Sequence, residues 1–509
     1  MAGVLGSGDH KVIGRLFIVT SLILGLVVLA LSEGFVIEAI KPETLDIFTS
    51  DTAYQLFTLA RIGFIFLLAM PLVIGVAMVV VPLQVGARTI AFPRAAAASF
   101  WGWFLGSLAL IGSYIGNGGP GGGSSIGVNL WITSMGLIVI SLLLASICLA
   151  TTVLALRPTG MYLQRVPLFS WSAMIAALLW LLTLPVLFAL IVLMYVDHRS
   201  AGSVFVGNPA TLYGSLTWLF RNPQIYVVAI PVLGFVADVL ATTSGARMQL
   251  RSVAQSAIAV FGILSFGAFL VAPSASALDS PLVLVMGLVA VLPLLALAAA
   301  CADLFRKGSF KLHAGVVYAV SAFLILLLGV AAGALGSFPN LLDAPKGTSV
   351  SNSIYFVGVS TAVLLATVIA SLGAIHWWAT KIGRRPANEK LGLLAPLVLL
   401  LGSAMAVIPD LVAGLTGKGL ELNADYTGGS AAGNGIAAAG IGLLALGVLI
   451  AVISFLPLFK KSDDEVEADP WNGLTLEWLA PSPPPLDNFV GDIPVVTSAE
   501  PLIDLREEK

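Results

Sequence analysis

The sequence predicts an all-α, polytopic membrane protein, a bundle of twelve transmembrane helices. Hydrophobic residues make up 58% of the 509 residues and charged residues only 10%, whereas soluble chains contain roughly 25% charged residues. Apolar runs of about 20 residues, the length that crosses a bilayer, recur from one end of the chain to the other. Basic and acidic loops alternate between these runs, as the charge bias of membrane proteins requires.

Each apolar run is interpreted as one membrane span, and several are long enough to tilt in the bilayer. The expected spans are residues 12–32, 56–84, 97–117, 129–156, 168–196, 210–242, 253–273, 280–304, 312–336, 353–379, 391–416 and 433–458. Loops that contain arginines, such as Arg88 and Arg94, alternate with loops richer in acids, such as Glu33 and Asp46. This bias predicts that both termini and the basic loops lie in the cytoplasm. We expect the membrane to be a bacterial cytoplasmic membrane.

Residues 1–458 form the expected membrane domain, and residues 459–509 form a proline-rich cytoplasmic tail. The tail begins where the composition becomes polar, and its proline run at 481–485 is typical of extended chain that packs along a bundle or a partner. The glycine-rich loop 116–125 predicts an external turn, because it lacks the Lys-Ser/Thr pair of a phosphate-binding loop. The net charge of -2 argues against nucleic acid as a partner.

The run at residues 216–240 is the most unusual span, because it contains Arg221 followed by Asn222, a proline and Gln224. A charge inside a bilayer is costly unless it faces protein or water, and the proline is expected to bend the helix. We therefore expect this helix, which also contains Tyr226, to line the centre of the bundle. The alternative is a kinked core helix whose polar groups satisfy one another.

Long stretches of the chain share their residue patterns with one family. They include QLFTLARIGFIFLLAMPLVIG from Gln55, VPLQVGARTIAFPR from Val81, LTWLFRNPQIY from Leu216 and, in the tail, DPWNGLTLEWLAPSPPPLDNF from Asp469. With these stretches the chain resembles subunit I of the heme-copper terminal oxidases, the cytochrome c oxidase subunit I family. The resemblance runs nearly end to end, and it implies the family's fold, a twelve-helix bundle in three arcs.

The resemblance also implies two hemes and a copper ion held by six histidines, yet this chain has too few. Its four histidines are His10, His198, His313 and His376. The family's low-spin heme histidine is matched by Ala60 and its copper histidine by Asn222. Its His-x-His heme pair is matched by Val357 and Val359. We therefore expect this degenerate relative to bind neither heme nor copper.

Further positions depart from the family in the same direction. Gln224 stands where the family has a proton-delivering glutamate, and Tyr226 is kept without the histidine to which the family's tyrosine is bonded. Arg61 and Arg221 replace glycines beside two matched ligand positions. We expect these four side chains to plug space that a porphyrin would occupy. The possible partners of the arginines are Asn222, Gln224, backbone carbonyls, and Asp238 or Asp410. The alternative is that either arginine extends toward a membrane interface.

Three functions are compatible with this pattern. We favour a redox-inactive, subunit I-like scaffold that forms a hetero-oligomer with other integral membrane subunits, resembling oxidase subunits II and III, in a respiratory or other heme/copper complex. The second function is that of a terminal oxidase subunit that reduces O2 with proton translocation, although this chemistry needs the metal centres. The third is that of a transporter, or of a lipid- or quinone-binding protein, that uses the vacated cavity, since intramembrane polar groups permit it.

Overall fold

The computed structural model describes residues 6–41, 48, 50–200, 209–268, 281–308, 311–337, 354–415, 431–460 and 466–507, and within its helices a few side chains, Arg221 among them, are left undescribed. The described residues are mainly helical and contain no strand. Eleven of the described helices are long and apolar enough to cross a membrane. The seventh expected span corresponds to the shorter apolar helix Arg251–Ser265, and its last expected residues, 269–273, lie outside the described residues. The all-α, multi-span fold class is thus confirmed.

The membrane helices follow one another along the chain, most of them joined by short connections. They are α2 (His10–Glu38), α3 (Ser50–Gly63), the π-helix η1 (Phe64–Ala69), α4 (Met70–Gln84), α5 (Pro93–Ile115), α6 (Ser125–Ala155), α7 (Leu168–Arg199), α8 (Pro209–Ser244), α9 (Arg251–Ala268), α11 (Pro281–Val289), α12 (Val291–Lys307), α13 (Ala314–Leu335), α14 (Ile354–Trp377), α16 (Glu389–Leu415) and α17 (Ala431–Phe455). Short elements are η2 (Leu163–Arg165), α15 (Ala379–Ile382), η4 (Leu456–Phe459), η5 (Leu476–Leu479) and α18 (Pro501–Glu507).

Three spans form the centre of the bundle. They are Thr52–Gln84, which joins α3, η1 and α4, Asn222–Ser244 in α8, and Ile354–Trp377, which is α14. In the most apolar 18-residue stretch of each of these spans, 89–94% of the residues are buried. The corresponding share in the other eight spans is 39–61%. A helix that is apolar all round is suited to such a central position, whereas the outer helices keep one face for lipid. All the matched ligand positions lie on these three central spans.

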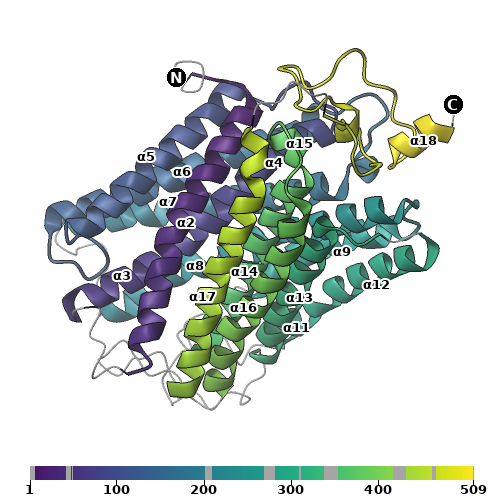
Figure 1. Ribbon diagram of the computed structural model, residues 1–509. Coiled ribbons are helices and arrows are strands. Elements are labelled where there is room, and N and C mark those ends of the chain that lie inside the picture. The colour runs from purple at the N-terminus through teal and green to yellow at the C-terminus, as the bar shows by residue number, and fades with distance from the viewer. Residues whose placement is uncertain are drawn as a thin grey trace.

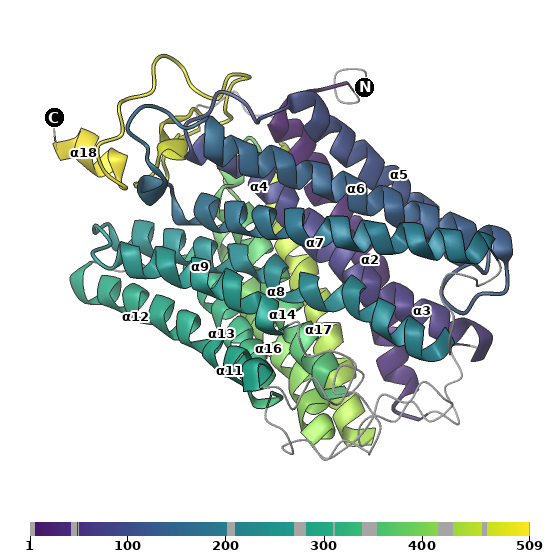
Figure 2. The same cartoon turned by 180° about the vertical axis from the view of Figure 1, so that it is seen from behind.

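The outer helices pack in pairs around this centre. In Figure 2, α5, α6 and α7 lie side by side on one flank, and α9, α11 and α12 lie on another. The pair α16 and α17 packs through glycines: a Cβ built on Gly440 would lie 2.5 Å from the backbone nitrogen of Ala406 and 2.9 Å from the carbonyl oxygen of Gly402. Small residues allow membrane helices to approach closely, so Gly440 sets the spacing of this pair.

The described part of the tail, residues 466–507, packs over the end of the bundle where α2 begins and α14 ends, which we call the tail end (Figure 1). Because it includes η5 and α18, it is not extended throughout. Two buried ionisable side chains hold it there, Glu477 of the tail and Lys381 of α15, each 1% exposed. The Lys381 ammonium donates to the carbonyl oxygens of Ala468 at 2.8 Å and of Ala480 at 2.5 Å. The tail is therefore part of the folded core at this end.

Candidate functional site

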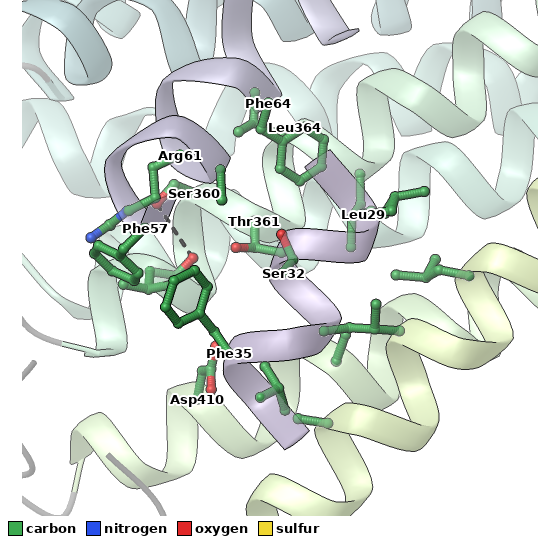
Figure 3. A pocket seen from close by; sticks show the side chains of 18 of the residues that line it. Leu29, Ser32, Phe35, Phe57, Arg61, Phe64, Ser360, Thr361, Leu364 and Asp410 are labelled. Carbon is green, nitrogen blue, oxygen red and sulfur yellow. Dashed lines mark hydrogen bonds between the residues drawn. The ribbon is translucent and has the colours of Figure 1, made fainter. Parts of the chain in front are cut away.

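A cavity of about 150 Å³ lies between α2, α3, η1, α14, α16 and α17, near the end of α2 and the beginning of α14, and Ile225 of α8 also reaches its wall. Ala60 and Val357 both line it, so two of the matched heme-ligand positions, contributed by different central helices, meet at one place. Apolar side chains such as Phe64 and Leu364 form most of the wall (Figure 3). Pockets for cofactors and ligands in proteins usually measure about 300–1,000 Å³, so this cavity is small for a heme.

Polar side chains also reach this cavity. They are Ser32, Arg61, Ser360, Thr361, Asp410 and Asn434. The Arg61 guanidinium lies 5.1 Å from the centre of the Phe57 ring, and both side chains belong to the cavity wall (Figure 3). The Asn434 amide donates to the carbonyl oxygen of Ala39 at 2.7 Å. Arg61 therefore lines the same cavity as Ala60, and its role as a plug stays a prediction.

The second position of the His-x-His match, Val359, faces a different region. A Cβ built on Gly333 of α13 would lie 3.4 Å from Val359 Cγ1 and would collide with the hydroxyl of Tyr226. Val359 is 1% exposed and Tyr226 is 6% exposed, and the Tyr226 ring lies 6.3 Å from that of Phe261. Successive positions on an α-helix turn by about 100°, so Val357 and Val359 point to opposite sides of α14. The space around Val359 is filled by neighbouring side chains.

At the matched copper position, Asn222 is buried and has no hydrogen-bond partner among the side chains and backbone that the structure describes. Asn222 and Gln224 are each 1% exposed, and neither amide atom of Asn222 nor the amide oxygen of Gln224 has a hydrogen-bond partner. The Gln224 nitrogen approaches the hydroxyl of Thr183 at 3.4 Å, while the indole nitrogen of Trp180 is also unpartnered. Most buried polar groups in proteins are hydrogen-bonded, so this group of amides is an unsatisfied point in an otherwise apolar core.

Asp238, one of the two aspartates expected as possible partners of the arginines, has its hydrogen bonds elsewhere. The two carboxylate oxygens of Asp238 accept hydrogen bonds at 3.0 Å from the backbone nitrogens of Leu168 and Phe169 at the start of α7. Gln84 donates to the same carboxylate at 3.0 Å. Asp238 also lies 17 positions after Arg221 on α8, which is about 25 Å along the helix. The Arg221 side chain lies outside the described residues, so its role as a plug stays a prediction.

The residues at the matched positions do not fit a heme or a copper ion. Alanine and valine offer no ligating atom, and these centres take imidazole, thiolate or thioether ligands. His10, His313 and His376 lie at the tail end, and His198 lies in the last turn of α7. Across the described ranges, no three or more His, Cys, Asp or Glu side chains are grouped as metal ligands would be. None of the four histidines lines the cavity.

No sequence pattern predicts the π-helical turn that follows Arg61. The segment FIFLLA is simply apolar, and yet Phe64–Ala69 forms the π-helix η1 between α3 and α4. Such turns are rare and occur often at functional sites. The widened turn begins directly after Gly63, beside the cavity, and so shapes the wall that Phe64 and Ile65 contribute.

Comparison with known proteins gives a consistent set of similarities. The family described as cytochrome c and quinol oxidase polypeptide I matches residues 12–455. A heme-copper oxidase subunit I+III from Aeropyrum pernix is 28% identical over 98% of this chain, which spans only 63% of that relative's length. A putative cytochrome c oxidase subunit 1-beta from Streptomyces avermitilis is 27% identical over 99% of this chain and 92% of its own.

Two further similarities agree with these. The cytochrome bo(3) ubiquinol oxidase subunit 1 of Buchnera aphidicola subsp. Schizaphis graminum is 28% identical over 98% of this chain and 79% of its own. Among solved structures, a chain of a heme-copper terminal oxidase dimer determined by cryo-EM superposes with a TM-score of 0.70 at 14% identity, covering 90% of this chain and 85% of that chain. At this identity the superposition shows a shared fold.

Proposed function

This chain belongs to the cytochrome c and quinol oxidase polypeptide I family, and from that premise we propose that it is a redox-inactive subunit I, a membrane scaffold within a respiratory or other heme/copper complex. It is a multi-pass membrane protein, like the bacterial oxidase subunits to which it is similar. The fold of the family is kept, while the residues that the family uses for its cofactors are not.

One observation supports the proposal more than any other. Ala60 and Val357 come from two central helices to a single cavity of about 150 Å³ and offer it no metal-ligating atom. Asn222, at the matched copper position, is buried with an unpartnered amide. In this family electron transfer and O2 chemistry belong to the cofactors, and the protein supplies their binding and orientation. A chain without the ligands is left with a structural role in the complex.

The proposed partners are integral membrane subunits that resemble oxidase subunits II and III, in a hetero-oligomer. The name of the Aeropyrum relative, subunit I+III, supports a subunit III-like neighbour. We also propose that both termini lie in the cytoplasm. Basic loops at the tail end support this orientation. A guanidinium nitrogen of Arg247 lies 2.6 Å from a carboxylate oxygen of Asp504, and one of Arg88 lies 3.9 Å from a carboxylate oxygen of Asp492. Both aspartates belong to the tail. Cytoplasmic loops carry such an excess of arginine and lysine.

A second candidate function is the binding of a lipid or quinone tail in the vacated cavity. The aliphatic and aromatic wall around Phe64 and Leu364 favours an apolar guest, and Arg61 and Asp410 offer polar contacts at the same cavity. At about 150 Å³ the cavity accepts a short segment of such a tail rather than a complete head and tail. We rank this function second, because the polar side chains on the wall also suit ordered water, which occupies polar cavities in folded proteins.

Deletion of the gene for this chain tests the scaffold. We expect the neighbouring membrane subunits to lose abundance in the membrane when the chain is absent and to recover when the chain is supplied from a plasmid. Turnover per heme in whatever complex remains is expected to be unchanged. Equal abundance of all other membrane subunits with and without the chain would contradict the proposal.

A further inference from the structure

The corner of the bundle where α5 begins and α6 ends is both basic and apolar. A Cβ built on Gly86 would lie 3.2 Å from Pro158 Cγ, and the backbone nitrogen of Ala91 donates to the Thr152 hydroxyl at 2.9 Å. The connection into α5 therefore runs antiparallel alongside the end of α6. The charged and large apolar side chains that stay accessible around this contact, which we call the α5–α6 corner, are Arg88, Phe92, Arg94, Leu154, Leu156 and Arg157.

Phe92 is held in an unfavourable backbone conformation with its ring outside. Its φ of 54° lies in the left-handed region, which bulky side chains rarely adopt and which often marks a functional position. Two contacts to α6 flank it: the Ala91 amide donates to Thr152, and the carbonyl oxygen of Phe92 accepts from the Cys148 thiol at 3.9 Å. The ring is nevertheless 57% exposed. The fold thus keeps a strained backbone that presents an aromatic ring outward.

The position of this ring relative to the membrane follows from the two spans. The span in α5 begins at Pro93 and the span in α6 ends at Ala155. Phe92 and Leu156 are therefore the residues directly outside the two spans, at the same boundary. Aromatic and basic side chains are enriched where a membrane meets water, so the corner has the composition of a membrane boundary.

An exposed apolar face of α6 leads from the membrane interior to the corner. Its large residues recur three or seven positions apart and so share one side of the helix. They are Leu130, Leu137, Ile140, Ile147 and Leu154, each 37–44% exposed. A lipid whose acyl chains lie on this face places its headgroup at the α5–α6 corner.

The charge of the corner selects among headgroups. Arg88 and Arg94 are exposed, and Arg157 adds a third positive charge while it donates to the carbonyl oxygen of Leu154 at 3.2 Å. Asp492 lies 3.9 Å from Arg88 and both side chains are well exposed, so this ion pair is weak. Net positive charge therefore remains for an anion. At the surface of a membrane, acidic phospholipids supply that anion.

We propose that the α5–α6 corner binds an acidic membrane phospholipid, with the phosphate on Arg88 and Arg94 and the Phe92 ring among the acyl chains. Guanidinium groups bind phosphate through paired, charge-assisted hydrogen bonds. The corner belongs to the outer flank that α5 and α6 form (Figure 2), so the proposal does not depend on whether the chain carries out redox chemistry. A partner subunit on the same flank is the competing occupant, and the experiments below separate the two.

Photo-cross-linking in native membranes identifies the occupant. The photoreactive amino acid benzoylphenylalanine replaces Phe92 in the full chain, and mass spectrometry identifies what it captures. We expect adducts on phospholipid acyl chains. Val490, 81% exposed in the tail beyond the spans, is the control position and is expected to give no such adduct. Capture of another protein from position 92, or the absence of lipid adducts, would overturn the proposal.

Native mass spectrometry of the full chain, purified with any subunits that accompany it, measures the preference for a headgroup. The delipidated protein is titrated with phosphatidylglycerol, phosphatidylethanolamine and phosphatidylcholine of identical acyl chains. Only phosphatidylglycerol among the three has a net negative charge, and we expect it to bind most tightly. Equal binding of all three lipids, or a preference for a zwitterionic lipid, would contradict the proposal.

A double variant locates the headgroup. Each basic residue near an acidic membrane surface contributes about fivefold in affinity, so Arg88→Gln with Arg94→Gln is expected to weaken phosphatidylglycerol binding about tenfold or more. Arg306→Gln with Lys390→Gln is the matched control, because it removes two exposed basic residues elsewhere at the tail end. The control is expected to keep the tightest-bound lipid. An equal loss in both double variants would show that the charge acts without a site and would overturn the assignment.

Phe92→Asn separates the ring from the backbone strain. Asparagine adopts the left-handed conformation more readily than phenylalanine, so we expect thermal stability in detergent to be unchanged or higher. The affinity for phosphatidylglycerol is expected to fall about three- to tenfold, because the apolar contact of the ring is lost. Undiminished affinity would show that the ring does not contact the lipid. A lower thermal stability would show that the ring packs on protein, and either result would overturn its assigned role.

Discussion

Asn222 and Asn488 are two buried asparagines with opposite surroundings. Asn488 accepts from Lys11 Nζ at 2.9 Å, lies 2.9 Å from His10 Nε2, and donates to the carbonyl oxygen of Ala87 at 2.8 Å. Asn222 makes none of these bonds, although both residues are at most 1% exposed. A buried amide without partners costs about 1–3 kcal/mol. Asn488 therefore stabilises the tail end, whereas Asn222 destabilises α8.

Replacement by leucine, which has a similar volume, separates the two cases. We expect Asn222→Leu to raise the free energy of unfolding by about 1 kcal/mol or more, because an unsatisfied amide is removed. Asn488→Leu is the matched control and is expected to lower it by about 2 kcal/mol or more, because three partners lose their bonds. Thermal denaturation of the purified complex measures both. Equal destabilisation by the two variants would contradict this account of Asn222.

Glu477 gives the tail a dependence on pH. Burial raises the pKa of its carboxyl from 4.5 to about 7, and the nearby Asp238 adds to the rise. One oxygen accepts from Gln84 at 3.1 Å and from Trp378 at 3.3 Å, while the other has no partner. The folded chain thus holds this proton more tightly than the unfolded chain. The stabilisation is complete below about pH 4.5 and is lost as the pH rises through about 7.

Hydrogen exchange of the tail backbone between pH 4.5 and 7.5, corrected for intrinsic exchange rates, measures this effect. We expect the free energy of opening at residues 474–480 to fall by on the order of 3 kcal/mol across that range, because folding raises the pKa of Glu477 from 4.5 to about 7. Glu477→Gln is expected to abolish the dependence of this protection on pH. Glu467 is an exposed acid in the same tail, and Glu467→Gln should leave the dependence intact. A slope that persists in Glu477→Gln would show that another group titrates.

At the scale of elements, α16 and α17 approach closely because Gly440 carries no side chain. Gly442, two positions later on the same helix, has nothing within 4 Å of a built Cβ. We expect Gly440→Val to force the helices apart and to lower the free energy of unfolding by about 1–3 kcal/mol. Gly442→Val is the control and should have little effect. The prediction fails if thermal denaturation shows the two valines to be equally tolerated.

The sequence predicted the helices well because each apolar run has only one stable solution in a bilayer, a helix. It also predicted that 216–240 lies at the bundle centre. It did not predict η1, since the residues of a π-helical turn do not differ in type from those of an α-helix. Nor did it predict that Val357 and Val359 serve different regions, or that Asp238 caps α7, because these depend on how α14 and α8 are rotated against their neighbours.

For the whole molecule, the family resemblance that predicted the fold is supported by a match over residues 12–455. The sequence predicts the replacement of cofactor ligands residue by residue, at Ala60, Asn222, Val357 and Val359, and this stays a prediction. The spatial relation of these residues could not be predicted, because a cavity depends on how side chains from several helices fill space. A further cavity, at the tail end, could not be predicted for the same reason: His313, His376 and the tail come together only in the folded bundle.

The heme and copper content of this polypeptide, separated from every companion subunit, tests the central claim most directly. The account predicts that heme-extraction spectra and metal analysis find substoichiometric heme and copper, far below one of either per chain, and that no Soret band follows the isolated polypeptide. The residues at the matched positions supply no imidazole to hold them. One or more hemes bound per chain, with a Soret band that follows this polypeptide through separation, would contradict the account.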